Sequence, residues 1–300
     1  MAEASTSYWA AQFGQTRRIE TPTFQDSAHF QGRFGPFCSF VTGQSGLSKY
    51  LSSRAKDCNP ASHGRLIGEV NRSSPLIELE SAAFSYGGGD ILTDVSLRLA
   101  PGSFHFLTGP SGSGKTTLLR LCYMQLLPSA GNIRIFGEDV RQIDRDQVAQ
   151  MRRRIGIVHQ DCQFLDHLTL TDNVALPLEV AGRDVEAESA NMAELLGWVG
   201  LSGQKNNFPP QLSGGERQRA ALARAVIMSP DVIIADEPTG NIDWEMAQRL
   251  LQLLIELNKM GKTILIATHD LNLIRNAKNH VAARVLRLHN RRLQLAGADL

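Results

Sequence analysis

The chain has 300 residues, of which 42% are hydrophobic and 20% are charged. This composition can supply a buried core for one large domain or two modest ones. The formal net charge is +1, so no global field attracts nucleic acid, and we expect no nucleic-acid partner. The four cysteines match no zinc or disulfide pattern. No apolar run reaches the ~18 residues that a bilayer span requires, so any membrane role would need a partner.

Residues 1 to 75 differ from the rest of the chain. They are rich in Ser, Gly, Gln, Phe and Arg, have few aliphatic side chains, and show no sustained periodicity. Little apolar surface could be buried there to offset chain entropy, so a disordered N-terminal extension is predicted. Three alternatives stay open: a binding tail built on the aromatic residues, a translation start near Leu76, and an organellar transit peptide. The early acids Glu3 and Glu20 count against the transit peptide.

From Leu76 onward, strand patterns alternate with helical ones. Strands are expected in "LIELESAAFSY", on both sides of the Pro-Gly turn in "VSLRLAPGSFHFLTGP", and in "RIGIVHQ", "VIIADEP" and "KTILIATHD". Short runs rich in branched apolar residues are typical of buried parallel strands. A helical stretch, "WEMAQRLLQLLIELNKM", separates the last two runs. Residues 76–300 are therefore predicted to form an α/β domain with a mostly parallel sheet. Strand patterns stop between about 162 and 215, which predicts a helical insert.

The segment "GPSGSGKT" fits the P-loop pattern G-x-x-x-x-G-K-[ST]. It follows the apolar run "FHFLT" and precedes the helical "TLLRLCYM", which is the context that a P-loop requires. Glycines allow the backbone N–H groups to surround a phosphate, and the helix start adds its positive dipole end. Lys115 is expected to reach the outer phosphates, and Thr116 to ligate Mg²⁺. The nucleotide-binding residues predicted here are Gly109, Pro110, Ser111, Gly112, Ser113, Gly114, Lys115, Thr116 and Thr117.

Two acids and a histidine end other predicted strands. Asp236 and Glu237 close "VIIADE", where Asp236 suits a magnesium ion and Glu237 can act as a general base toward water. His269 ends "ILIATH" and is expected to contact the γ-phosphate, because parallel sheets gather their chemistry at the carboxyl ends of strands. The alternatives are two solvated acids and a capping or core histidine.

Two further residues are candidate ligands of the nucleotide. Gln160 in "IVHQD" also ends a strand and could reach Mg²⁺ or the attacking water. Tyr86 in "FSYGGGD" could stack on adenine, with the following glycines allowing close approach. An ordinary exposed aromatic is an equally open interpretation of Tyr86.

A second glycine motif, "LSGGERQR", raises the question of why one chain needs two anion-binding helix starts. Ser213, Gly214 and Gly215 are expected to open the helix "ERQRAALARAVIM", whose free N–H groups form a phosphate site. That site could face the γ-phosphate bound by a second copy of the chain. The alternative is an ordinary helix start, in which "SGGE" is a capping box.

Taken together and in this order, the motifs resemble those of the ATP-binding-cassette ATPases over about residues 76 to 295. The resemblance implies a P-loop NTPase core with an antiparallel β subdomain and a helical subdomain, and an ATP-closed homodimer with Mg²⁺. It also implies that Glu237 is the catalytic base, His269 the γ-phosphate switch, and Lys115 a catalytic phosphate ligand. Gln160 would link nucleotide to partner, and Asp243 would line the dimer seam.

Within the family, "DEPTGNID" looks like the cassettes that serve lipoprotein release, macrolide export and cell division. The segments "HLTLTDNVALPLEVAG" and "KNNFPPQLSGGERQR" are similar to the cell-division members. That similarity implies a four-span membrane partner, a septal role, and a place on the cytoplasmic face of the inner membrane. Phe164 and Leu165 are the candidate partner contacts. The N-terminal extension and Ile242, where Leu is usual, depart from the pattern. A lipoprotein-release or macrolide-export ATPase is the alternative.

Overall fold

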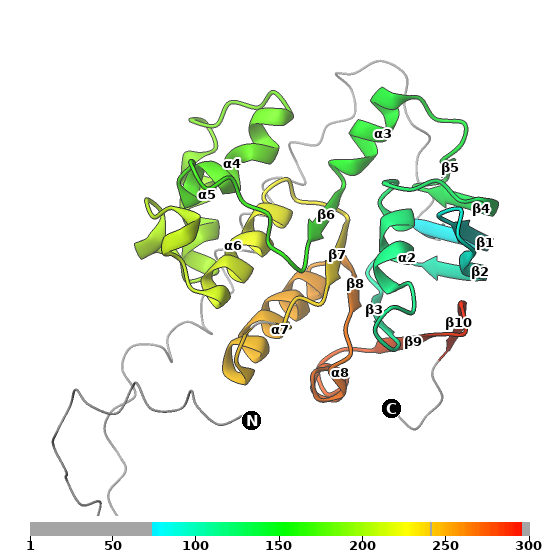
Figure 1. Cartoon of the computed structure of the whole chain (residues 1–300). Coiled ribbons are helices and arrows are strands. Elements are labelled where there is room, and N and C mark those ends of the chain that lie inside the picture. Colours follow the sequence, from blue (N-terminus) through cyan, green and yellow to red (C-terminus); the bar gives the residue numbers. More distant parts are fainter. Residues whose placement is uncertain (1–73, 241, 296–300) are drawn as a thin grey trace, which may run out of the picture. The chain divides into compact units, whose positions relative to one another are not determined.

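The computed structural model describes residues 74–240 and 242–295 (Figure 1). The predicted N-terminal extension falls almost entirely outside the described residues. The fold subdivides into two sheets and a set of covering helices, and its class agrees with the predicted α/β architecture.

The larger sheet has six strands in the order β10-β9-β3-β8-β7-β6. Five of them run parallel, and β10 pairs antiparallel with β9 at one edge. The strand bounds are β3 Phe104–Thr108, β6 Ile155–Val158, β7 Val232–Asp236, β8 Thr263–Ala267, β9 Ala283–His289 and β10 Arg292–Leu295. The runs "FHFLT", "RIGIVHQ", "VIIADEP" and "KTILIATHD" supply four of the parallel strands, as the sequence predicts.

The smaller sheet is antiparallel, with the order β2-β1-β4-β5. Its strands are β1 Ile77–Ser85, β2 Asp90–Leu99, β4 Ala130–Ile135 and the two-residue β5 Glu138–Asp139. Alternating burial along β2 places one face of this sheet on a core and leaves the other face toward solvent. The sequence pattern predicted β1 and β2, whereas β4, β5, β9 and β10 were not predicted.

The helices fall into two groups that pack into different cores. Residues of α2 Lys115–Cys122 and the antiparallel strands share one core. Residues of α4 Leu170–Val180, α5 Ser189–Trp198, α6 Gly214–Val226, α7 Trp244–Lys259 and α8 Leu271–Lys278 share the other. Helices α4 and α5 lie beside α6, with which they pack (Figure 1). The remaining helical elements are α3 Arg145–Arg152 and the 3₁₀ turns η3 Ser202–Gln204 and η4 Pro209–Gln211.

Strands β3, β6, β7 and β8 are covered on both faces, which explains their mostly apolar sequences. In β3, Phe104 and Phe106 pack into the core with the helical group, whereas Leu107 packs into the core with α2. Successive side chains of a strand point to opposite faces, so a slip of one residue would exchange these two sets. Burial on both faces therefore fixes the register of the sheet.

The described part of residues 162–215 contains helices and no strand, although the boundaries of a helical subdomain stay a prediction. Helix α6 begins near the end of this range and continues to Val226, where it packs against β6. Among the described residues, no helix is both long and apolar enough to cross a membrane.

The contact between α6 and β6 leaves no room for a side chain at Gly156. A Cβ atom placed there would lie 2.3 Å from the carbonyl oxygen of Ala225 and 3.0 Å from Cγ of Pro230. Gly156→Ala is therefore expected to push α6 from the sheet and lower the free energy of unfolding by about 1–3 kcal/mol. Chemical denaturation measures the change as a shift in midpoint.

A matched control is Gly203→Ala, because a Cβ atom there meets no heavy atom within 4 Å. That change is expected to alter the free energy of unfolding by less than about 0.5 kcal/mol. Equal midpoints for the two variants would show that the close approach of α6 to β6 is not real.

Candidate functional site

The predicted functional residues meet at one edge of the larger sheet. In the parallel ladder, Leu107 pairs with Ala267, and Ala267 in turn pairs with Asp236. Val158 of β6 pairs with Ala235 on the other side of β7. The segments that follow these residues leave the sheet at its carboxyl edge, which is where α/β sheets bind ligands. These segments contain the P-loop, the two acids, His269 and Gln160.

The P-loop connects β3 to α2 through glycines that no other residue could replace without strain. At Gly109, φ is 155°, and a Cβ atom would lie 2.5 Å from the carbonyl oxygen of Leu288. Gly114 is the N-cap of α2 with φ of 101°, in the left-handed region. Pro110, Ser111 and Gly112 are exposed between them. The loop is thus held in a fixed curve whose tip is accessible to a ligand.

Lys115 is buried at the centre of this curve. Its Nζ donates to the carbonyl oxygens of Gly109 (3.0 Å) and Pro110 (3.4 Å). The same nitrogen lies 3.7 Å from Oε1 of Glu237. A buried ammonium group that touches both the loop and the acid after β7 can bind a triphosphate that enters between them. Thr117, two residues after Lys115, is buried in the first turn of α2.

Thr116 and Asp236 form a direct pair. The Thr116 hydroxyl donates to Oδ2 of Asp236 at 2.7 Å. Burial raises the pKa of Asp236, Glu237 raises it further, and the hydrogen bond from Thr116 and the charge of Lys115 oppose this. A cation beside Asp236 would offset the cost of its buried charge.

The Thr116–Asp236 pair fits Mg²⁺ because it offers only oxygen ligands. Among the described residues, no three His, Cys, Asp or Glu side chains converge on a metal site. A magnesium ion here would therefore need phosphate oxygens or water to complete its shell.

Glu237 lies between Lys115 and His269. Its Oε2 is 2.9 Å from Nδ1 of His269, and its side chain is mostly shielded from solvent. The backbone of Glu237 has φ of 46°, a left-handed conformation that is unusual outside glycine. Its N–H donates to the carbonyl oxygen of Ala267, which ties this conformation to β8. Strained residues of this kind cluster at functional sites.

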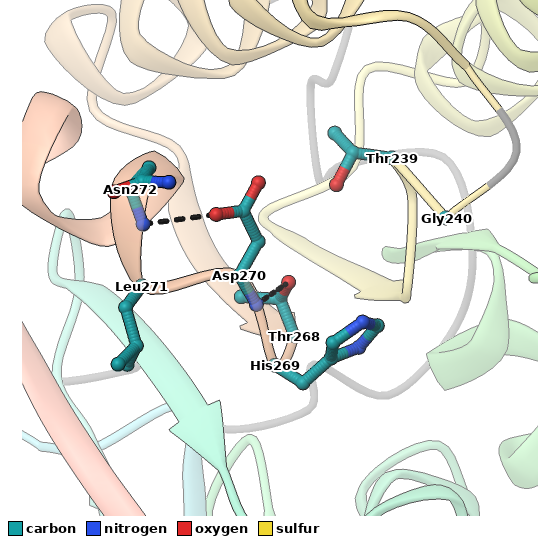
Figure 2. Close-up of a pocket in the computed structure, with 7 residues that line it drawn as sticks. All are labelled: Thr239, Gly240, Thr268, His269, Asp270, Leu271 and Asn272. Carbon is teal, nitrogen blue, oxygen red and sulfur yellow. Dashed lines mark hydrogen bonds between the residues drawn. The ribbon is translucent and has the colours of Figure 1, made fainter.

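A pocket of about 410 Å³ opens beside this pair (Figure 2). Thr239 and Gly240 line it from the loop after β7, and residues 268–272 line it from the junction of β8 and α8. Asp270 caps α8 by accepting from the N–H groups of Asn272 and Leu273. The pocket gives solvent access to His269, whose side chain is 74% exposed.

Gln160 and Tyr86 both lie on exposed segments. Gln160 follows β6 by two residues and is exposed. Tyr86 follows β1, is 56% exposed, and makes an edge contact with Phe84 at a centroid distance of 4.7 Å. The free ring face of Tyr86 is compatible with stacking, and the oxygen of Gln160 is available as a ligand.

The second glycine motif lies on α6, away from the core that contains α2. Ser213 is the N-cap, and Ser213 and Glu216 form the capping box that was the alternative interpretation. The box uses the N–H groups of Ser213 and Glu216. In the described part of the chain, the N–H groups of Gly214 and Gly215 have no protein acceptor, because they precede the first intrahelical bonds. The capped helix therefore keeps two donors for an outside anion.

The start of α7 lies against this motif. A Cβ atom on Gly215 would be 3.0 Å from Cγ of Met246. Asp243, predicted to line a dimer seam, is the exposed N-cap of α7 and accepts from the N–H of Met246 at 2.9 Å. The motif and Asp243 thus belong to one surface of the chain.

The predicted partner contacts, Phe164 and Leu165, differ in exposure. Phe164 is half-buried, and the Arg224 guanidinium lies 4.6 Å from its ring centroid. Leu165 is 44% exposed. The buried amide of Asn173 accepts from the N–H of Leu165 and donates to the carbonyl oxygens of Leu165, Leu168 and Thr169. The loop backbone is held rigidly, while the side chain of Leu165 points out.

Sequence reasoning missed two features near the site. The thiol of Cys162 donates to Oε1 of Gln218 on α6, and burial raises the pKa of Cys162 to about 11. The turn between β9 and β10 lines a pocket with the P-loop. A basic residue in a hairpin turn belongs to no recognisable motif, so the sequence does not indicate that this turn lies beside the P-loop.

Comparison with known proteins identifies the family. A family model described as ABC transporter matches residues 92–240. The cell division ATP-binding protein FtsE of Escherichia coli (strain K12) is 44% identical over 200 residues, covering 66% of this chain and 90% of FtsE. FtsE of Bacillus subtilis (strain 168) is 38% identical, covering 69% and 92%. The macrolide export ATP-binding/permease protein MacB of Sodalis glossinidius is 38% identical, covering 71% and 33%.

The fold matches a solved cassette of the same kind. The ATP-binding cassette MJ0796, in a dimeric post-hydrolysis state bound to ADP and Pi, superposes with a TM-score of 0.66 and 32% identity. That match covers 74% of this chain and 99% of MJ0796. The chain therefore belongs to the ABC transporter ATPases and is a nucleotide-binding ATPase of that family.

Proposed function

We propose that this chain is the ATP-hydrolysing subunit of a membrane complex of the FtsEX kind, which couples ATP-driven dimerisation to cell division. The observation that carries the enzymatic part is the contact of Glu237 with both Lys115 and His269. The similarity to FtsE over about nine-tenths of the length of the Escherichia coli protein supports the cellular role.

In the proposed reaction, Glu237 accepts a proton from a water molecule. The water oxygen forms a bond to the γ-phosphorus of ATP as the bond from that phosphorus to the bridging oxygen breaks, and ADP leaves. Lys115 stabilises the charge that spreads over the phosphoryl oxygens, and His269 donates to the γ-phosphate. The hydrogen bond between His269 and Glu237 orients the base before the nucleotide binds.

Mg²⁺ is proposed to bind at Thr116 and Asp236, with Gln160 as a further oxygen ligand. When bound, it would neutralise phosphate charge. The Thr116–Asp236 hydrogen bond holds both oxygens in place, so the chain contributes a preformed part of the site. The remaining P-loop residues, Gly109 to Thr117, are proposed to bind phosphate, and Tyr86 to stack on adenine.

The homodimer is proposed to be head-to-tail, with Ser213, Gly214 and Gly215 of each copy facing the nucleotide of the other. Two observations support this arrangement. The motif starts a helix that belongs to a different core from α2, and it retains two N–H donors. The related cassette MJ0796 is itself dimeric.

The membrane partner is proposed to be an FtsX-like integral protein, which would place the chain at the cytoplasmic face of the inner membrane. Exposed Leu165, presented on the loop that Asn173 holds, is a suitable apolar contact. Septal wall hydrolases would then be activated through the partner. The match to MacB supports a second candidate, an ATPase of a macrolide-export or lipoprotein-release transporter. Identification of the membrane protein that copurifies with the chain decides between them.

Glu237→Gln tests the catalytic base. The amide keeps the size of the side chain but cannot accept the proton, so turnover is expected to fall by at least ~10²-fold while ATP still binds. ATP-dependent dimers should accumulate, measured by size exclusion with light scattering. The control is Glu194→Gln, which removes an exposed acid of α5 and should leave turnover unchanged. Near-normal turnover in Glu237→Gln would refute the assignment.

Ser213→Arg tests whether the α6 motif acts on the other copy. Alone, this variant is expected to bind ATP as a monomer but to hydrolyse almost none. Lys115→Ala should also be inactive, because it lacks the phosphate ligand. A mixed dimer of the two variants contains one site with an intact P-loop and an intact facing motif, so mixing should restore activity.

Ser202→Arg places the same bulk on another exposed serine of the helical region and serves as the control. Thermal unfolding separates a loss of helix capping, about 1 kcal/mol, from a loss of assembly. Absence of activity in the mixture, together with weaker ATP binding by monomeric Ser213→Arg, would place the motif in the same chain's site.

Leu165→Glu tests the partner surface. The charge is expected to abolish copurification of the chain with the membrane protein, while ATPase activity of the isolated chain is retained because the loop backbone is held by Asn173. Leu295→Glu is the matched control, since Leu295 is 75% exposed on β10 and lies on a different element. Equal copurification of the two variants would exclude Leu165 from the interface.

A further inference from the structure

The turn between β9 and β10 adopts a conformation that its sequence disfavours. It has two residues, Asn290 and Arg291, with φ of 48° and 65°. Positive φ at both positions defines a type I′ turn, for which Asn-Gly is the preferred pair. Asn tolerates the left-handed region, but an arginine at the glycine position is strained. Strained residues of this kind cluster at functional sites.

This turn lies directly beside the P-loop. Residues 289–291 line a pocket of about 370 Å³ together with P-loop residues 110–113 and the first two residues of β2. The turn is fixed there, because the carbonyl oxygen of Arg291 accepts from the N–H of Thr93 at 2.8 Å. The strand before the turn is equally close, since Leu288 blocks any side chain at Gly109.

The charges around this pocket suit the sugar and first phosphate of a nucleotide. His289 and Arg291 are basic groups on the turn side, and Asp90 is the acid that faces them from β2. Arginine binds phosphate oxygens through charge-assisted hydrogen bonds, and carboxylates commonly accept from ribose hydroxyls. Asp90 pairs with Ser85 in the β1–β2 ladder, and Ser85 directly precedes Tyr86 in the chain. The pocket thus lies between the proposed adenine platform and the proposed phosphate loop.

We infer that Arg291 is a nucleotide-binding residue that contacts the α-phosphate, with Asp90 on the ribose, in the pocket between the β9–β10 turn and the P-loop. This inference rests on the proposed function, because it takes the nucleotide to run from Tyr86 to Lys115. Arg291 would strengthen binding of both ADP and ATP, since both contain the α-phosphate. Its effect would appear in affinity rather than in the chemical step.

Arg291→Gly separates binding from stability, because the two should change in opposite directions. Glycine relieves the left-handed strain, so the nucleotide-free variant is expected to melt about 2–4 °C higher than the unmodified chain. Loss of the guanidinium is expected to raise the Kd for Mg-ADP roughly tenfold by calorimetry, the scale of one charge-assisted hydrogen bond. In steady state, the KM for ATP should rise while kcat changes little.

Arg284→Ala is the charge-matched control, because it removes one exposed arginine from β9 at the end opposite the turn. Its Kd for Mg-ADP should stay within about twofold of the unmodified chain, since a distant exposed charge is screened. If Arg291→Gly binds Mg-ADP as tightly as Arg284→Ala, the inference is wrong, whatever its melting temperature. If Lys115→Ala nevertheless loses Mg-ADP binding in the same assay, the proposed function is retained and only the role of Arg291 is rejected. If the unmodified chain binds neither ADP nor ATP, both fail.

Discussion

The fixed register of the parallel ladder β3-β8-β7 is the constraint on which the site depends. Pairing of Leu107 with Ala267, and of Ala267 with Asp236, ends three strands at the same level. Side chains from the two faces of each strand pack into two separate cores, so neither face can be exchanged for the other. The P-loop, the acids and His269 consequently leave the sheet side by side, although they are far apart in sequence.

Several residues at this edge adopt arrangements that cost folding free energy but place their functional groups close together. Asp236 is partly buried, and burial raises its pKa, which is a cost that the Thr116 hydroxyl offsets only in part. Glu237 follows with a left-handed backbone that places its carboxylate between an ammonium group and an imidazole. Gly109 has no space for any side chain. A chain selected for folding alone would have little reason to combine these features in three adjacent loops, which strengthens the proposal that they serve nucleotide chemistry.

The sequence predicted those parts of the fold whose pattern is local. A strand buried on both faces gives a short, mostly apolar run, so β3, β6, β7 and β8 were predicted. β9 was not, because its exposed Arg284, Arg287 and His289 interrupt the apolar pattern. The β9–β10 turn also lacks the glycine that identifies a type I′ hairpin. Residue roles at the P-loop and after β7 could be proposed from motifs, whereas the proximity of Arg291 to the P-loop is produced by strand pairing that no single segment encodes.

The start of α6 shows why a pattern alone could not choose between a capped helix and a ligand-binding motif. Ser213 and Glu216 satisfy each other's backbone N–H groups, so the helix is complete within one copy. The N–H groups of Gly214 and Gly215 come before the first intrahelical bond and are not needed for that completeness. A Cβ atom on Gly215 would lie 3.0 Å from Cγ of Met246, so a larger residue there would have to displace that side chain. The same four residues can therefore stabilise their own helix and still bind a phosphate presented by another molecule.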